Sequence, residues 1–205
     1  MNIMDMLQGQ LPAGLVDQLS QQIGGADREQ TATAASGIMN TLVSALARNA
    51  SSQEGAASLA NALDRDHNDG GVLNNLMGML SGNVQPQNER AANGAGILNH
   101  ILGDRQGGVS NMVSQMSGLN GGQTSQLMTM LAPMVMGMLG KTKQENGLDV
   151  SGLASLLNGT VSQQKQSNPT MNLVTSFLDQ DGDGSIVDDV ASMGMKFLGG
   201  LFSKK

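Results

Sequence analysis

The sequence contains no cysteine. This absence excludes disulfide bonds, thiolate nucleophiles and cysteine-ligated zinc or iron–sulfur sites. Tyrosine and tryptophan are also absent, and the three phenylalanines, Phe177, Phe197 and Phe202, lie close to the C-terminal end. The rest of the core must therefore consist of leucine, isoleucine, valine, alanine and the flexible side chains of the 16 methionines.

Basic residues are few. The chain has 11 lysines and arginines against 17 aspartates and glutamates, which gives a formal net charge of −6. The basic residues are scattered along the sequence, whereas nucleic-acid binding requires lysine and arginine clusters that neutralise phosphates. We therefore expect no nucleic-acid partner.

The sequence shows no segment typical of export or membrane insertion. Its first 16 residues, MNIMDMLQGQLPAGLV, include Asp5 and have neither a basic opening nor a long apolar run. The most apolar segment, 123–140, is shorter than the roughly 20 apolar residues that span a bilayer. We therefore expect a cytoplasmic protein that is not a membrane protein.

Segment 123–140, QTSQLMTMLAPMVMGMLG, is apolar on nearly every side of a helical wheel, and from Leu127 to Leu139 its single polar residue is Thr129. A helix that is apolar all round must be buried among other helices. Pro133 has no N–H group and crowds the preceding turn, which predicts a bend or a restart there and leaves the carbonyl of Thr129 without its helical partner.

Helical spacing of apolar residues predicts seven further helices: 12–23, 27–48, 51–63, 72–80, 86–102, 109–116 and 148–157. Asp27 with Gln30, and Ser51 with Glu54, have the spacing of N-terminal capping boxes. No segment alternates like a strand. The predicted fold class is all-α, a multi-helix bundle around the buried methionine-rich helix 123–140, with a C-terminal EF-hand-like loop flanked by short helices.

The composition divides the chain into three parts. Residues 1–158 form the predicted helical bundle, the Gln/Ser-rich stretch 159–168 is interpreted as a linker, and 169–205 holds the acidic loop and its flanking helices. Residues 141–147 are interpreted as a charged loop. The similar sequences GIMNTL at 37–42 and GILNHI at 96–101 are compatible with either a duplicated helical hairpin or chance.

The sharpest local motif is the aspartate-rich segment 179–189, DQDGDGSIVDD. Asp179, Asp181 and Asp183 occupy positions one, three and five of a calcium-loop pattern, where alternate carboxylates converge on a hard cation. A glycine follows at position six, and Ser185 at position seven offers its carbonyl oxygen.

The loop departs from the calcium pattern at position twelve, where Val190 replaces the usual bidentate glutamate. Asp189 is the candidate closing ligand, and binding of Ca²⁺ should be about micromolar or weaker. The predicted metal ligands are Asp179, Asp181, Asp183, Ser185 and Asp189. The alternative is an acidic surface turn that binds no ion.

The leading functional hypothesis is a non-enzymatic helical interaction module with an unknown protein partner and an undetermined oligomeric state. The main alternative is a metal-dependent enzyme that uses Asp64, Asp66, His67 and Asp69, although a polar loop between helices explains this cluster equally well. A third hypothesis is a membrane-associated assembly protein that uses the short basic amphipathic tail 193–205, for which docking back onto the bundle is the simpler explanation.

Four segments carry a family resemblance: NASSxEGA at 49–56, ALDRDH at 62–67, GILNHILG at 96–103 and MLAPMVMG at 130–137. Together they resemble the bacterial family called domain of unknown function number nine hundred thirty-seven, which is related to the YidB-like proteins. The resemblance implies an all-helical bacterial protein that often ends in an acidic Asp-Gly repeat. It implies no activity and no catalytic residues.

Overall fold

The computed structural model describes residues 13–67 and 89–167 of the chain. Within these residues the regular structure is helical throughout, which confirms the all-α prediction for them. The elements are α2 (Ala13–Gln22), α3 (Arg28–Asn49), α4 (Gln53–Asp66), α6 (Glu89–Ala92), α7 (Gly94–Leu102), the 3-10 turn η1 (Gly103–Arg105), α8 (Gln106–Ser117), α9 (Gly121–Glu145) and α10 (Val150–Ser167).

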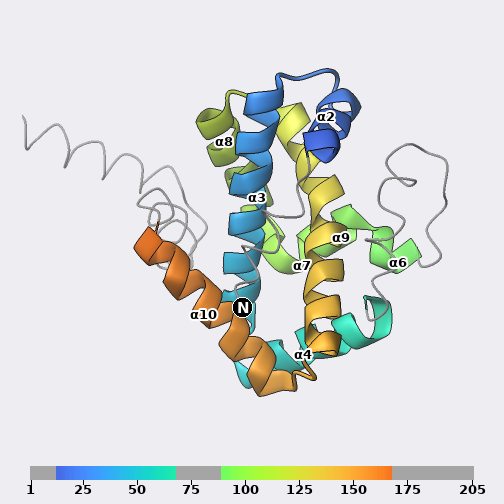
Figure 1. Cartoon of the computed structure of the whole chain (residues 1–205), viewed down its shortest axis with the longest axis vertical. Helices are drawn as coiled ribbons and strands as arrows, with labels where there is room; N and C mark the ends of the chain where they lie inside the picture. The colour runs from blue at the N-terminus through green and yellow to red at the C-terminus, as the bar shows by residue number, and fades with distance from the viewer. Residues whose placement is uncertain (1–12, 68–88, 168–205) are drawn as a thin grey trace, which may run out of the picture.

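Two long helices, α3 and α9, run side by side through the centre (Figure 1). Helices α7 and α8 pack against both of them, α2 packs against α3, and α4 packs against α9. Helix α10 lies across α3 and α4. The shorter helices therefore enclose a central pair.

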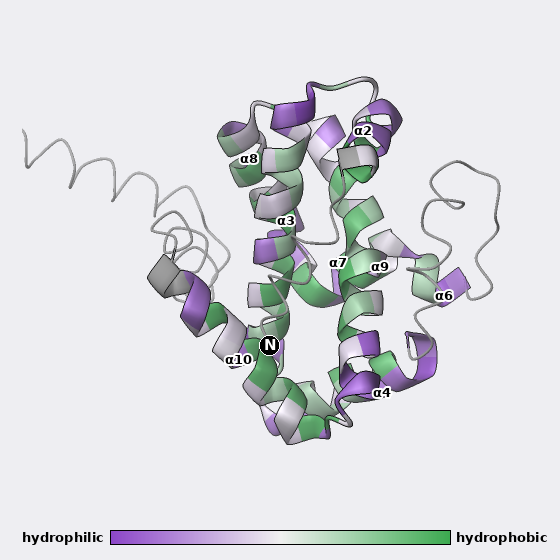
Figure 2. Cartoon of the chain, in the orientation of Figure 1, coloured by the Kyte–Doolittle hydropathy of each residue, from purple (hydrophilic) through white to green (hydrophobic). Residues whose placement is uncertain are grey.

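Both central helices are buried over long stretches. Every residue of α9 from 131 to 140 is buried, and so is every residue of α3 from 38 to 47. Figure 2 shows hydrophobic residues along much of α9, whereas hydrophilic residues are interspersed with them along α3. Because an apolar helix surface must be covered by other apolar groups, α3 and α9 together position the rest of the fold.

Helix α9 continues unbroken from Gly121 to Glu145 and contains Pro133 in its interior. The helix therefore does not restart at this proline. It begins with a capping box, in which the Asn120 side chain accepts from the Gln123 N–H at 2.9 Å and the Gln123 side chain accepts from the Asn120 N–H at 3.1 Å. Residues 141–145, expected to belong to a charged loop, form its last turn instead.

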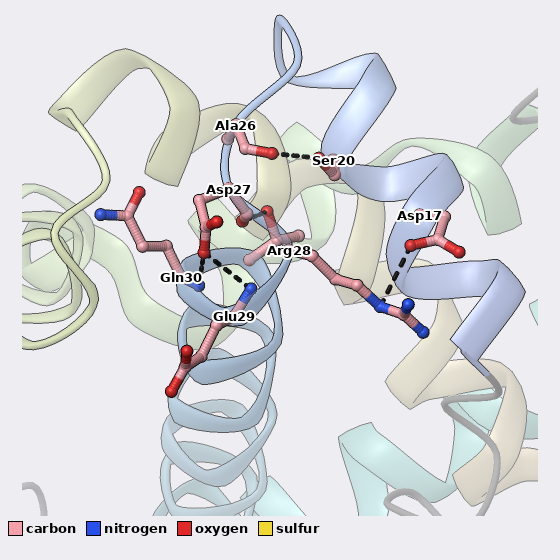
Figure 3. Close-up of polar contacts among 8 residues, drawn as sticks. Asp17, Ser20, Ala26, Asp27, Arg28, Glu29 and Gln30 are labelled. Atoms are coloured by element: carbon pink, nitrogen blue, oxygen red, sulfur yellow. Dashed lines mark hydrogen bonds and ion pairs between the residues drawn. The ribbon is translucent and has the colours of Figure 1, made fainter.

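The N-terminal caps follow the predicted chemistry with one shift in position. The Asp27 carboxylate accepts from the backbone N–H groups of Glu29 at 2.8 Å and Gln30 at 3.0 Å (Figure 3). Helix α4 is capped by Ser52, which accepts from the Gly55 N–H at 3.0 Å, so the prediction of Ser51 as the cap was wrong by one residue.

Residues 159–167, which the composition led us to interpret as a linker, are helical and form the second half of α10. The polar composition suggested exposed chain, but Thr160 and Gln164 are buried. The Gln164 side-chain amide donates to the Asn40 side chain of α3 at 2.9 Å. This contact across the α3–α10 interface keeps a polar stretch in the helix.

The predicted helix 86–102 is divided in the structure into α6 and α7, because Asn93 caps α7 with its side chain. Across residues 13–67 and 89–167, no helix has both the length and the apolar character required to cross a bilayer.

Candidate functional site

A cavity of about 790 Å³ lies alongside α4 and α7. It is lined along α4 from the cap residue Ser52 to His67 at the other end of the helix, and along α7 from Asn93 to Ile101. Leu46 of α3 and Met136 of α9 also line it. The two central helices thus close its inner side.

The cavity collects basic side chains. The chain contains five arginines and two histidines, and this one cavity is lined by four of the arginines and both histidines. These six residues are Arg48, Arg65, Arg90, Arg105, His67 and His100. Among the described residues Asp66 is the one acidic side chain in the lining. An acidic protein therefore has a basic cavity.

The lining changes from charged to apolar with depth. At the mouth, Arg90 and His100 are exposed and the Arg65 side chain is 64% exposed. Five lining residues are buried: His67 and the four apolar side chains that we call the floor, Leu46, Leu59, Ile101 and Met136. Arg48 and Arg105 are half-buried between these levels. A ligand that entered would meet positive charge first and apolar surface below.

Asp66 and Arg65 form an ion pair inside this lining. The carboxylate of Asp66 accepts from the Arg65 guanidinium at 2.7 Å and 3.0 Å. This hydrogen bond, and next the negative charge of Asp66, raise the pKa of Arg65 above its usual value. The charge of Arg65 is therefore balanced by Asp66 within the cavity lining.

Two helices begin at the cavity. Ser52 caps α4 by accepting from the Gly55 N–H, and Asn93 caps α7 by accepting from the Gly96 N–H at 2.9 Å. All four residues line the cavity. Because the N-terminal end of a helix carries a partial positive charge, both helix starts add to the potential of the arginines.

Specific contacts hold the walls in place. The Asn49 side-chain amide donates to the Ile101 carbonyl at 3.1 Å and thereby ties the end of α3 to α7. The carbonyl of His67 packs directly against Gly140 of α9, where a Cβ atom would overlap it. On the outer side of α4, Asp64 pairs with Lys143 of α9 at 2.5 Å. The end of α4 is thus fixed to the central helix.

The structure separates the acidic residues of the proposed enzyme site. Asp64 is exposed and paired with Lys143, whereas Asp66 pairs with Arg65. His67 is buried, and Asp69 lies outside the described residues. In the part of the chain that the structure describes, no three histidine, aspartate or glutamate side chains form a potential metal site.

The predicted calcium ligands lie outside the described residues, and so does the tail 193–205. These ligands are Asp179, Asp181, Asp183, Ser185 and Asp189. Their prediction continues to rest on the spacing of the aspartates.

The arginine cavity was missed by the sequence analysis, which described the basic residues as scattered. Its arginines, at positions 48, 65, 90 and 105, are too far apart in the sequence to form a motif. Arg48 and Arg65 each lie in the last turn of a helix, where a basic residue is ordinarily explained by the helix dipole. Their shared location depends on how the helices pack.

The comparisons with known proteins give one result. A family model described as "Bacterial protein of unknown function (DUF937)" matches residues 5–142, which is more than half of the chain. Neither the curated proteins nor the solved structures contain a match.

Proposed function

The chain belongs to this bacterial family of unknown function, and from that premise we propose that it is a non-enzymatic binding module whose cavity holds a small anionic ligand. The observation that carries the proposal is the collection of four of its five arginines and both histidines around one cavity. A protein with a net charge of −6 has no general reason to concentrate its arginines in this way.

The chemistry of arginine favours this ligand class. The guanidinium is planar and always charged, and its donors match carboxylate and phosphate oxygens in pairs. The volume of about 790 Å³ lies within the roughly 300–1,000 Å³ range of small-molecule pockets. The hydroxyl groups of Ser52 and Ser58 offer further hydrogen-bond donors.

A binding role agrees better with the lining than a catalytic role. General acid–base catalysis needs a side chain that is able to exchange a proton with the substrate. The carboxylate in the lining, Asp66, already accepts two hydrogen bonds from Arg65. The four arginines keep their charge and are hydrogen-bond donors that would hold an anion.

The proposal is tested by titration calorimetry of the full chain with inorganic pyrophosphate at low salt. Wild type should bind, and Arg105→Gln should bind about 10- to 100-fold more weakly, because a hydrogen bond to a charged group contributes about 1.5–3 kcal/mol. Arg28→Gln is the matched control, since Arg28 pairs with Asp17 at 3.1 Å and does not line the cavity. No binding by wild type, or equal losses in both variants, would refute the anion site.

We also propose that segment 179–189 binds Ca²⁺, with support from the spacing of its aspartates. Asp181→Ala should abolish the heat of calcium binding, whereas Asp17→Ala, in helix α2, should leave it unchanged. Equal heats in wild type and Asp181→Ala would remove this site. The outcome is independent of the pyrophosphate titration.

A further inference from the structure

We infer that the ligand of the cavity is an amphiphilic anion: a carboxylate or phosphate monoester attached to an aliphatic chain. This inference rests on the proposed function and specifies its ligand. It follows from the arrangement of charged and apolar groups by depth within the same cavity.

The apolar floor is the first part of the argument. Leu46, Leu59, Ile101 and Met136 are buried in the protein yet line the cavity. A small inorganic anion would contact the arginines and leave this floor uncovered. An aliphatic chain attached to the anion would lie against it and gain the free energy of removing the chain's own apolar surface from water.

The other apolar side chains of the lining also favour an aliphatic group. Within the described residues the lining contains no phenylalanine, tyrosine or tryptophan, and its two rings are the imidazoles of the buried His67 and the exposed His100. Met136 provides a flexible thioether that adapts to a chain of variable shape. Half-buried Ile97 and Ala62 continue the apolar surface from the floor towards the mouth.

The charged head has a defined place at the mouth. Arg65 and Arg90 are exposed there, and Arg105 is half-buried. A head group held at this level keeps contact with water and avoids the desolvation that a charge on the apolar floor would suffer. The head would therefore stay with the arginines while the chain points towards Met136.

The test is a series of alkyl phosphates, with methyl, butyl and octyl phosphate titrated into the full chain below their aggregation concentrations. Burial of each methylene should strengthen binding by about fourfold, so octyl phosphate should bind at least about 100-fold more tightly than methyl phosphate. Octyltrimethylammonium, which has the same chain and the opposite charge, should not compete.

Two variants separate the floor from the head. Ile97→Gln places a polar group in the apolar lining, so it should weaken the binding of octyl phosphate and leave the binding of methyl phosphate unchanged. Val161→Gln is the matched control, because Val161 is also half-buried but lies on α10, away from the cavity. Arg105→Gln should weaken the whole series.

The outcomes distinguish the two proposals. Equal affinities for methyl and octyl phosphate, both reduced by Arg105→Gln, would overturn the proposal of an amphiphilic ligand and would still support an anion site. If octyltrimethylammonium bound as tightly as octyl phosphate, the cavity would not discriminate between ligands of opposite charge. That result would overturn both proposals. The absence of binding by every alkyl phosphate and by pyrophosphate would also overturn both.

Discussion

The carbonyl of Thr129 in α9 packs directly against Gly94 at the start of α7, so closely that a Cβ atom on residue 94 would overlap its oxygen. Pro133, four residues later, has no N–H group to donate to that carbonyl. The proline that interrupts the hydrogen bonding of α9 thus lies opposite the glycine that brings α7 close to it. The contact also positions Asn93 and Gly96 in the cavity wall.

Gly94→Ala should destabilise the protein by about 1–3 kcal/mol, because the added methyl group forces the two backbones apart. Gly159→Ala is the matched control: Gly159 lies in the interior of α10, and a Cβ atom there meets nothing within 4 Å. That change should stabilise by about 0.5–1 kcal/mol through helix propensity. Urea denaturation measures both, and similar stabilities for the two variants would contradict the close contact.

Asp66→Asn should strengthen binding of anions in the cavity. The substitution removes the acidic charge of the lining and releases the Arg65 guanidinium from its ion pair. Loss of one repulsive charge near the ligand should raise the affinity for pyrophosphate by about three- to tenfold, and less at high salt.

The control for this prediction is Asp64→Asn, which removes the same charge two residues earlier. Asp64 is exposed, pairs with Lys143 and does not line the cavity. Its replacement should change the affinity little. Weaker binding of pyrophosphate by Asp66→Asn, or an equal gain in affinity in both variants, would contradict a repulsive effect of the Asp66 charge on the ligand.

The pH dependence of α10 should follow Asp149, which precedes the helix. Its carboxylate accepts from the Gly152 N–H at 2.7 Å and from the Ser151 hydroxyl at 2.8 Å. The backbone hydrogen bond from Gly152, and next the bond from Ser151, lower the pKa of Asp149 below its ordinary 3.8. The stabilisation is therefore complete above about pH 3.8 and is lost as the pH falls through the lower, folded pKa.

Asp149→Asn keeps a cap oxygen and removes the titration. Wild type should be more stable than this variant in urea at pH 6, and the difference should shrink as the pH falls below 3.8. Asp104→Asn, in the turn η1, controls for the loss of one negative charge. A difference between wild type and Asp149→Asn that stayed constant from pH 6 to pH 3 would contradict the role of the carboxylate.

Local features of the fold could be predicted from the sequence because they depend on neighbours in the chain. The cap at Asp27 follows from the bonds to the next turn, and the apolar run of α9 predicts a helix that requires cover. The spacing of residues in the sequence does not decide whether Ser51 or Ser52 caps α4. Ser51 instead donates to the carbonyl of Arg48 at 2.7 Å, which leaves the cap to Ser52.

The features that could not be predicted from the sequence depend on contacts between residues that are far apart in the chain. Gln164 is kept in a helix by Asn40, 124 positions away. The four arginines come together because α3, α4 and the α6–η1 region meet around one cavity. The order of residues along the chain does not predict this arrangement of helices. Composition describes the net charge of the chain, whereas the cavity depends on where packing places a few charges.

The methionines provide the last prediction, because peroxide oxidises a thioether only where it reaches the sulfur. Met116 is 43% exposed on α8, whereas Met128 in α9 is 0% exposed. Peptide mass spectrometry after brief peroxide treatment should show Met116 oxidised at a rate near that of free methionine, and Met128 at least about tenfold more slowly. Met136 lies on the cavity floor, so octyl phosphate should slow its oxidation without affecting Met116. Equal rates at Met116 and Met128 would mean that α9 is not enclosed, and the cavity built on it would lose its inner wall.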